Sequence, residues 1–201
     1  MKIKSVFFIA AAIGASIAFT SFTSSSIENS KTNNIAAPDT SDTKRVVIND
    51  QYSLAIPKHM KVTKELNDDA SLQYQNLEEE LYIIVIDEPT DEFINVFRRE
   101  KGWDPGMTNA ENYRRVQMAS MKKKIKIKGK PVIRKTKAGS ISMEIVDFSG
   151  KVKGISFPIF YKIGFLESGK NLYMIMSWTL DERKSLHNST MEEMLKSFRA
   201  E

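Results

Sequence analysis

The side chains with the clearest chemical potential are the cations between Lys122 and Lys137. Nine residues in a row read Lys-Lys-Lys-Ile-Lys-Ile-Lys-Gly-Lys, and further cations follow within seven positions. Such a concentration of positive charge attracts phosphate head groups, lipopolysaccharide or an acidic protein. Lysines also serve at helix C-termini and on sheet edges, where they deter edge-to-edge pairing. The candidate anion- or partner-binding patch is Lys122, Lys123, Lys124, Lys126, Lys128, Lys130, Arg134 and Lys135.

The acidic residues offer a weaker candidate, a site for a hard cation. Such a site needs six to eight oxygens around one point, and the twelve-residue calcium-loop spacing is absent. We expect Glu78–Glu80 to lie in a turn. Asp91 and Glu92 are expected in the first turn of a helix, where the helix dipole favours acids. We therefore expect no metal site.

The sequence contains few residues that could serve as catalytic nucleophiles or bind a cofactor. The chain has no cysteine, and its two histidines are His59 and His187. Both are expected on the surface. Ser185 and Ser189 stand two positions from His187 on an expected helix, where i and i+2 do not face each other. Because Gly-x-Ser-x-Gly and nucleotide-binding glycine loops are also absent, we expect no catalytic residue and no cofactor. A hydrolase that uses a carboxylate pair stays open, since sequence gives no separation between carboxyl groups.

An apolar ligand is a second alternative. Methionine adapts its shape to a ligand, and several such side chains fall on two alternating segments near the C-terminus. On strands beneath helices, the same side chains are expected to form ordinary core. The residues concerned are Tyr161, Phe165, Met174, Met176 and Trp178.

The N-terminus has the pattern of a secretory signal. Lys2 and Lys4 precede an uncharged, almost wholly apolar run, Ser5–Phe19, and a Ser/Thr-rich stretch follows. The run is shorter than the ~20 residues of a spanning helix. We expect residues 1–24 to be a signal peptide, with an uncleaved anchor as the alternative. A diacylated lipoprotein is excluded, since no cysteine follows the run. The mature protein is thus expected to be soluble, in the periplasm or secreted.

Two further segments follow the signal. Residues 25–44 are polar and predict a flexible linker, and residues 45–201 predict one folded domain. Removal of two lysines with the signal lowers the formal net charge from +5 to +3. An exported chain without interleaved aromatic residues around its lysines is not expected to bind nucleic acid.

The elements that must position these residues follow from hydrophobic periodicity. Asn49-Asp50 suits a tight hairpin turn, and Ala138-Gly139 and Ser168–Lys170 suit two more. Pro158 inside an alternating run predicts an edge position or a bulge. Strands are expected at residues 46–48, 52–56, 72–77, 81–86, 132–137, 139–149, 155–166 and 172–180.

Three helices are expected between and after these strands. Thr90 is a candidate N-cap, Thr108 with Glu111 forms a capping-box pattern, and Ser189 with Glu192 is a second such pattern. The apolar stripes that face the sheet are Phe93, Val96, Phe97, Tyr113, Val116, Met121, Met191, Met194, Leu195 and Phe198. The order of strands, helices, strands and helix predicts an α+β fold, with a mainly antiparallel sheet of about six to seven strands flanked by helices.

This layout resembles the PsbP-like superfamily. Three features carry the resemblance: the segment Tyr52-Ser-Leu-Ala-Ile-Pro57, the hairpin series from Pro131 to Leu180, and the closing Met194-Leu-Lys-Ser-Phe198. The resemblance implies an α/β/α sandwich, shared with a nuclear-import factor that binds the GTPase Ran and with exported bacterial DcrB-like proteins. It implies a non-enzymatic protein without catalytic residues to carry over. We therefore expect an exported accessory or binding protein of the cell envelope that acts through protein–protein contacts.

Overall fold

The computed structural model describes residues 42–99 and 103–201, so the expected signal peptide lies outside it. The strands are β1 (Thr43–Ile48), β2 (Tyr52–Pro57), β3 (Lys61–Val62), β4 (Leu72–Asn76), β5 (Leu81–Pro89), β6 (Ile125–Ala138), β7 (Ile141–Val152), β8 (Ile159–Ser168), β9 (Asn171–Leu180) and β10 (Arg199–Ala200). The helices are α1 (Thr90–Arg99), α2 (Asn109–Met121) and α3 (Lys184–Lys196), the last preceded by a 3-10 turn (Asp181–Arg183).

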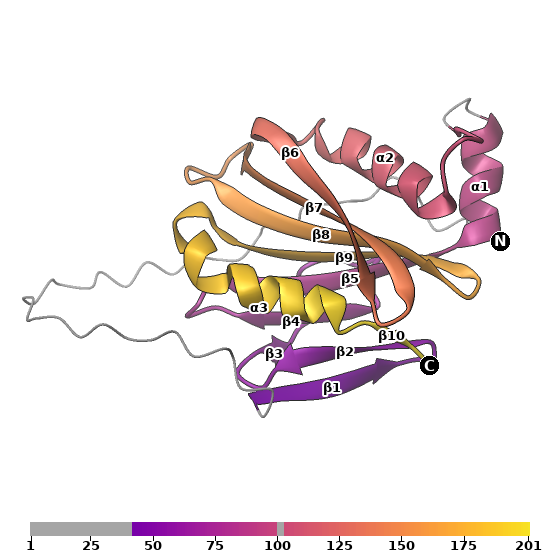
Figure 1. Cartoon of the computed structure of the whole chain (residues 1–201). Helices are drawn as coiled ribbons and strands as arrows, with labels where there is room; N and C mark the ends of the chain where they lie inside the picture. The colour runs from indigo at the N-terminus through magenta and orange to yellow at the C-terminus, as the bar shows by residue number, and fades with distance from the viewer. Residues whose placement is uncertain (1–41, 100–102) are drawn as a thin grey trace, which may run out of the picture.

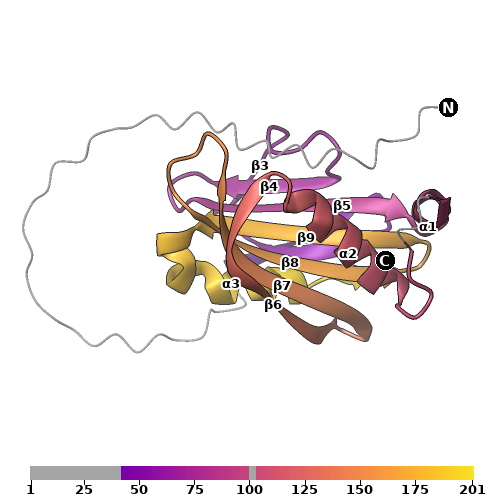
Figure 2. The same cartoon turned by 90° about the horizontal axis from the view of Figure 1, so that it is seen from above.

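Seven strands form one antiparallel sheet in the order β3-β4-β5-β9-β8-β7-β6. Helices α1 and α2 lie over one face, while α3 and a small three-stranded sheet cover the other (Figure 1). The expected α+β sandwich with a mainly antiparallel sheet is therefore confirmed. Seen from above, β3–β4 and β6–β7 form the two opposite sides of the large sheet (Figure 2).

The central strands are buried on both faces because alternate side chains enter two separate cores. On β5, Ile84 and Ile86 join the core under α1 and α2, whereas Ile83 and Val85 join the core under α3. Strands β8 and β9 alternate in the same way. Two-sided burial produces the near-continuous apolar runs seen in the sequence.

The opening hairpin does not join the large sheet. Asn49 and Asp50 adopt left-handed φ values of 49° and 52°, as a tight turn between β1 and β2 requires. Strand β2 then pairs with β10, at the end of the chain, to form a separate sheet in the order β1-β2-β10. Tyr52 stacks on Phe198 with ring centroids 5.6 Å apart. The sequence pattern predicts the hairpin but not this second sheet.

Three local predictions about strand and helix ends are wrong. Pro158 is not in an edge strand, because β8 begins at Ile159 and pairs on both sides. Thr90 begins α1, but its buried hydroxyl has no hydrogen-bond partner and so makes no cap. Ser189 lies inside α3, where its hydroxyl donates to Glu193. Polar or cyclic side chains near a boundary therefore do not by themselves show how that boundary is formed.

The other capping box is confirmed. Thr108 Oγ1 accepts from the backbone N–H of Glu111, and Glu111 Oε2 accepts from the backbone N–H of Thr108. This fixes the start of α2, which then ends at Met121 just before the run of lysines. None of the helices in residues 42–99 and 103–201 is long and apolar enough to cross a membrane.

Candidate partner-binding surface

The predicted patch begins in the turn after α2, which holds Lys122, Lys123 and Lys124, and continues along β6, an edge strand of the large sheet. The strand begins at Ile125, earlier than the expected 132, so the central lysines belong to a strand. Its pairing with β7 shifts between Lys128 and Val132, and Gly129 within the shift has a φ of 72°. This bulge divides the patch into two parts. We call residues 122–130 the proximal segment and residues 132–138 the distal segment.

The two cations of the patch in the distal segment are neutralised by acids. One nitrogen of the Arg134 guanidinium lies 2.9 Å from Asp147 Oδ2 and 3.1 Å from Glu192 Oε2. Lys135 Nζ lies 2.8 Å from Glu111 Oε1, and this hydrogen bond raises the pKa of Lys135. Arg134 and Lys135 are therefore ion-paired within the fold and add no free positive charge to the patch.

Arg134 belongs to a larger network that the sequence analysis missed. Lys162, in the middle of β8, has a side chain that is 1% exposed, and its Nζ lies 3.0 Å from Glu192 Oε2 and 3.4 Å from Asp147 Oδ2. Lys196 Nζ approaches Glu192 at 2.7 Å. Although burial opposes ionisation, hydrogen bonds from Lys196, Arg134 and Lys162 hold the pKa of Glu192 down at about 2. A lone lysine inside an apolar strand was the signal that could have revealed this network.

The proximal segment differs, because its strand lysines Lys126 and Lys128 form no ion pair among the described residues. Lys126 lies directly opposite Lys151 of β7 in the strand register, and both are exposed. Like charges at such positions repel each other. Within residues 42–99 and 103–201, no carboxylate lies within ion-pair distance of Lys122, Lys123, Lys126, Lys128, Lys130 or Lys151. The excess positive charge of the patch is therefore concentrated at this end of the edge.

The acidic turn after β4 contacts both histidines of the chain. Glu78–Glu80 lie in the β4–β5 turn, as expected. His59 Nε2 lies 3.2 Å from a carboxylate oxygen of Glu79, and His187 Nε2 lies 3.0 Å from its backbone oxygen. His187 is 4% exposed, so its predicted surface position is wrong; burial lowers the pKa of its imidazole. No group of three or more acidic or histidine side chains in the described part of the chain could hold a metal ion.

Glu88 is a second titratable group that the sequence analysis missed. It ends the apolar part of β5 beneath α2, where Tyr113 Oη donates to its Oε1 at 3.0 Å and Gln117 Nε2 donates at 3.1 Å. Burial raises the pKa of Glu88 to about 7, and nearby Asp69 and Asp87 act in the same direction. This carboxyl is held by neutral donors, in contrast to Glu192.

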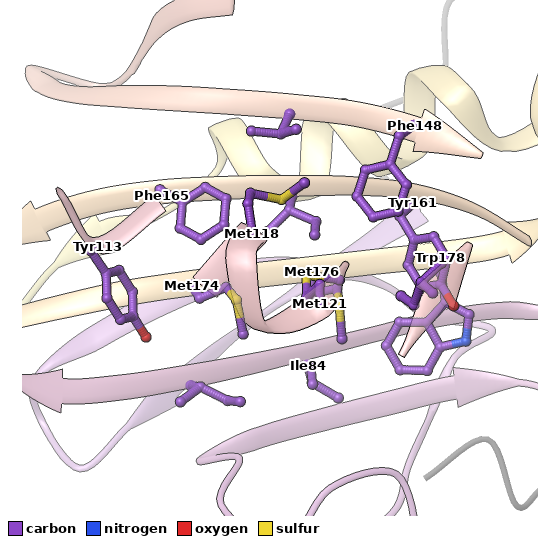
Figure 3. Packing of buried hydrophobic residues seen from close by; sticks show 14 of the residues in the cluster. Ile84, Tyr113, Met118, Met121, Phe148, Tyr161, Phe165, Met174, Met176 and Trp178 are labelled. Atoms are coloured by element: carbon purple, nitrogen blue, oxygen red, sulfur yellow. The ribbon is translucent and has the colours of Figure 1, made fainter. Parts of the chain in front are cut away.

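The methionine and aromatic residues that were a candidate ligand cleft are core. Met174, Met176 and Trp178 of β9 pack against Tyr161 and Phe165 of β8 under α2 (Figure 3). Their exposed fractions are between 0% and 7%. This agrees with the expectation of ordinary core and removes these residues as a ligand site.

An open groove lies instead beside the small sheet. It has a volume of about 370 Å³. Its walls are formed by β1, by β3 with the residues that follow it, and by β4. Gln73 makes one wall firm, because its side-chain oxygen accepts from the backbone N–H groups of Leu66 and Asn67 and its nitrogen donates to the Asn67 carbonyl. The apolar part of the lining is Val46, Ile48, Val62, Ala70, Leu72 and Tyr74.

No protein-family model matches the chain, and no curated protein sequence matches it. The solution structure of cyanobacterial PsbP from Synechocystis sp. PCC 6803 matches it with a TM-score of 0.51 and 9% identity, over 86% of this chain and 98% of that one. The chain has a PsbP-like fold. At this identity the likeness concerns the fold, as the resemblance in the sequence predicted.

Two further solved structures are similar at lower scores. The Ran-binding protein Mog1p of Saccharomyces cerevisiae has a TM-score of 0.46 and 12% identity, over 78% of this chain and 94% of that one. LpqN of Mycobacterium tuberculosis, described as involved in cell envelope biogenesis, has a TM-score of 0.44 and 10% identity, over 74% of this chain and 82% of that one.

Proposed function

We propose that this protein is an exported, non-enzymatic binding protein of the cell envelope that docks an acidic partner protein through its proximal segment. The observation that carries the proposal is the Lys126–Lys151 pair, two exposed like charges held opposite each other beside the exposed Lys128. Such an arrangement costs stability in the free protein. An acidic partner would relieve the repulsion, and the positive field would also speed its encounter.

A protein partner fits this edge better than an extended lipid surface. Val132 and Ile133 follow directly along the same strand and are 56% and 49% exposed. Their side chains point to opposite faces of the strand. A flat membrane can cover one face only, whereas a protein can enclose the edge and contact both.

The experiment is an affinity capture from envelope extract with the full mature chain. We expect a stoichiometric partner to be retained by the wild type and lost by the double variant Lys126→Glu/Lys128→Glu. The matched control is Lys61→Glu/Lys64→Glu, at the opposite edge of the sheet beside β3, which should retain the partner. Retention should fall steeply as salt is raised.

Two results would contradict the proposal. One is a partner that the Lys126→Glu/Lys128→Glu variant captures as well as the wild type does. The other is co-sedimentation with anionic phosphatidylglycerol vesicles that depends on the same lysines while no protein is captured, which would assign the segment to lipid.

Export is a separate part of the proposal and rests on the charged, apolar and polar order of residues 1–26. Mass spectrometry of the protein from fractionated cells should find a chain that begins near residue 25 in the periplasmic or secreted fraction. A chain that still begins at Met1 in the membrane fraction would instead show the uncleaved anchor.

The groove beside β1 favours a second candidate function, carriage of a small apolar ligand. Its volume lies near the lower end of the range for ligand pockets. Native mass spectrometry should then find a lipid bound to the wild type and to Val47→Trp, whose position is exposed, but not to Val46→Trp, which fills the groove. Absence of any bound lipid would remove this candidate.

A further inference from the structure

Strand β6 is long and is paired with another strand along only one of its two edges. Among the described residues its only strand partner is β7, and it forms one side of the large sheet (Figure 2). An edge of this kind presents backbone N–H and C=O groups to a further strand. Pro131, at the end of the bulge, has no N–H to donate. The continuous part of the edge therefore runs from Val132 to Lys137.

The charged side chains along this edge disfavour pairing with most other strands. Lys130 and Lys137 are exposed on either side of Val132 and Ile133, so a second copy of β6 would bring lysines against lysines. Neutral strands gain nothing from these cations. An acidic strand gains from each of them, since opposite charges on adjacent strands attract.

The proximal lysines extend the same complementarity. They are continuous with the distal edge along one strand, and Lys126 already opposes Lys151. An acidic chain that continued past the bulge would place its carboxylates beside this pair. The two segments would thus act together: the proximal segment attracts the chain, and the distal edge holds it in register.

We infer that the partner presents an extended acidic segment that adds as a strand to β6 along Val132–Lys137. This inference rests on the proposed function and names the form in which the partner binds. Strand addition supplies main-chain hydrogen bonds for affinity, while alternate side chains give selectivity. Apolar residues of the segment would cover Val132 on one face and Ile133 on the other.

Two synthetic peptides of about eight residues, a usual strand length, separate strand pairing from simple charge attraction. Both alternate valine with glutamate, and one is N-methylated at alternate backbone nitrogens, which removes donors but leaves the charge unchanged. Binding to the full mature chain is measured by isothermal titration calorimetry. Amide hydrogen exchange by NMR then reports which amides of β6 become protected.

We expect the unmethylated peptide to bind about tenfold more tightly, because several backbone hydrogen bonds are lost by methylation. It should slow exchange at outward amides between Val132 and Lys137. The control Lys61→Glu should bind as the wild type does, and Lys126→Glu/Lys128→Glu should bind more weakly.

Equal binding of the two peptides, without new protection in β6, would overturn strand addition. Partner capture that depends on the proximal lysines would survive that result, so the two failures are distinguishable. Protection confined to β3, at the other edge of the sheet, would also overturn the inference.

Discussion

The proximal and distal segments of β6 contain the same kinds of residue but differ in electrostatic state. In the distal segment, Arg134 contacts Asp147 and Glu192, and Lys135 contacts Glu111. In the proximal segment, Lys126 faces Lys151. The register of the sheet and the placement of the helices thus decide whether a cation on this strand lies beside an acid or beside another cation.

The acids that neutralise the distal segment come from three different elements. Asp147 is on β7, Glu192 is on α3, and Glu111 is in the first turn of α2. The opposite position on β7 in the proximal segment carries another lysine. The distal segment is therefore tied into the fold by ion pairs, and the proximal segment is the one that we propose for binding.

The largest effect on stability is expected when an acid is removed from the ion-pair network of the distal segment. Glu192→Ala leaves the buried Lys162 with one carboxylate instead of two and should lower the free energy of unfolding by about 3 kcal/mol. Urea denaturation measures the change. The control Glu193→Ala alters an exposed neighbour on the same helix and should change stability little. Equal effects of the two variants would show that the network does not stabilise the fold.

The pH dependence of the same carboxylate is the second test. Because the pKa of Glu192 is lowered to about 2 from 4.5, its contribution is complete above about pH 4.5 and is lost as the pH falls towards 2. Urea midpoints measured for the wild type and for Glu192→Gln should therefore converge over this interval. A constant difference between the two proteins down to pH 2 would contradict the expectation.

Glu88 provides a further contrast, because it is half-buried and its hydrogen-bond donors are neutral. Its pKa is raised to about 7, so its contribution is present below about pH 4.5 and is lost as the pH rises through 7. Tyr113 and Gln117 of α2 donate to it, and Asp69 and Asp87 repel its ionised form. Glu88→Gln should be more stable than the wild type above pH 7, as measured by thermal denaturation. A wild type that loses no stability between pH 5 and pH 8 relative to this variant would contradict this assignment.

The smallest expected change in stability is in the proximal segment, where a substitution should stabilise the protein instead of destabilising it. Lys126→Glu places a carboxylate opposite Lys151 and should stabilise the protein by about 0.2–1 kcal/mol while it weakens partner binding. The gain should shrink at high salt. Lys130→Glu is the control, since Lys130 lies in the bulge without a paired residue on β7. Destabilisation by Lys126→Glu would show that the lysine pair serves the fold.

Much of the local structure could be predicted because it depends on neighbours in the chain. The capping box of Thr108 and Glu111 and the turn at Asn49-Asp50 each involve residues within four positions. The two-sided burial of β5 follows from its apolar run. The false cap at Ser189 shows the limit: the same residue types occur inside a helix, where the hydroxyl bonds to the next turn instead.

The candidate site could be predicted only in part. Sequence located all the lysines but counted Arg134 and Lys135 with the others, because their acids are distant in the chain; Glu192 is 58 positions from Arg134. Lys162 and Glu88 were missed for the same reason, since their burial depends on the packing of α3 and α2.

The α+β class, the PsbP-like order of elements and the basic segment can all be recognised without coordinates, since they depend on periodicity and composition. Which of those cations form ion pairs depends on the fold. Pairing of β6 with β7 and packing of α2 and α3 brought acids to the distal segment and a lysine to the proximal one. Electrostatic energy depends on distance between charges, and distance across strands is fixed by register rather than by sequence separation.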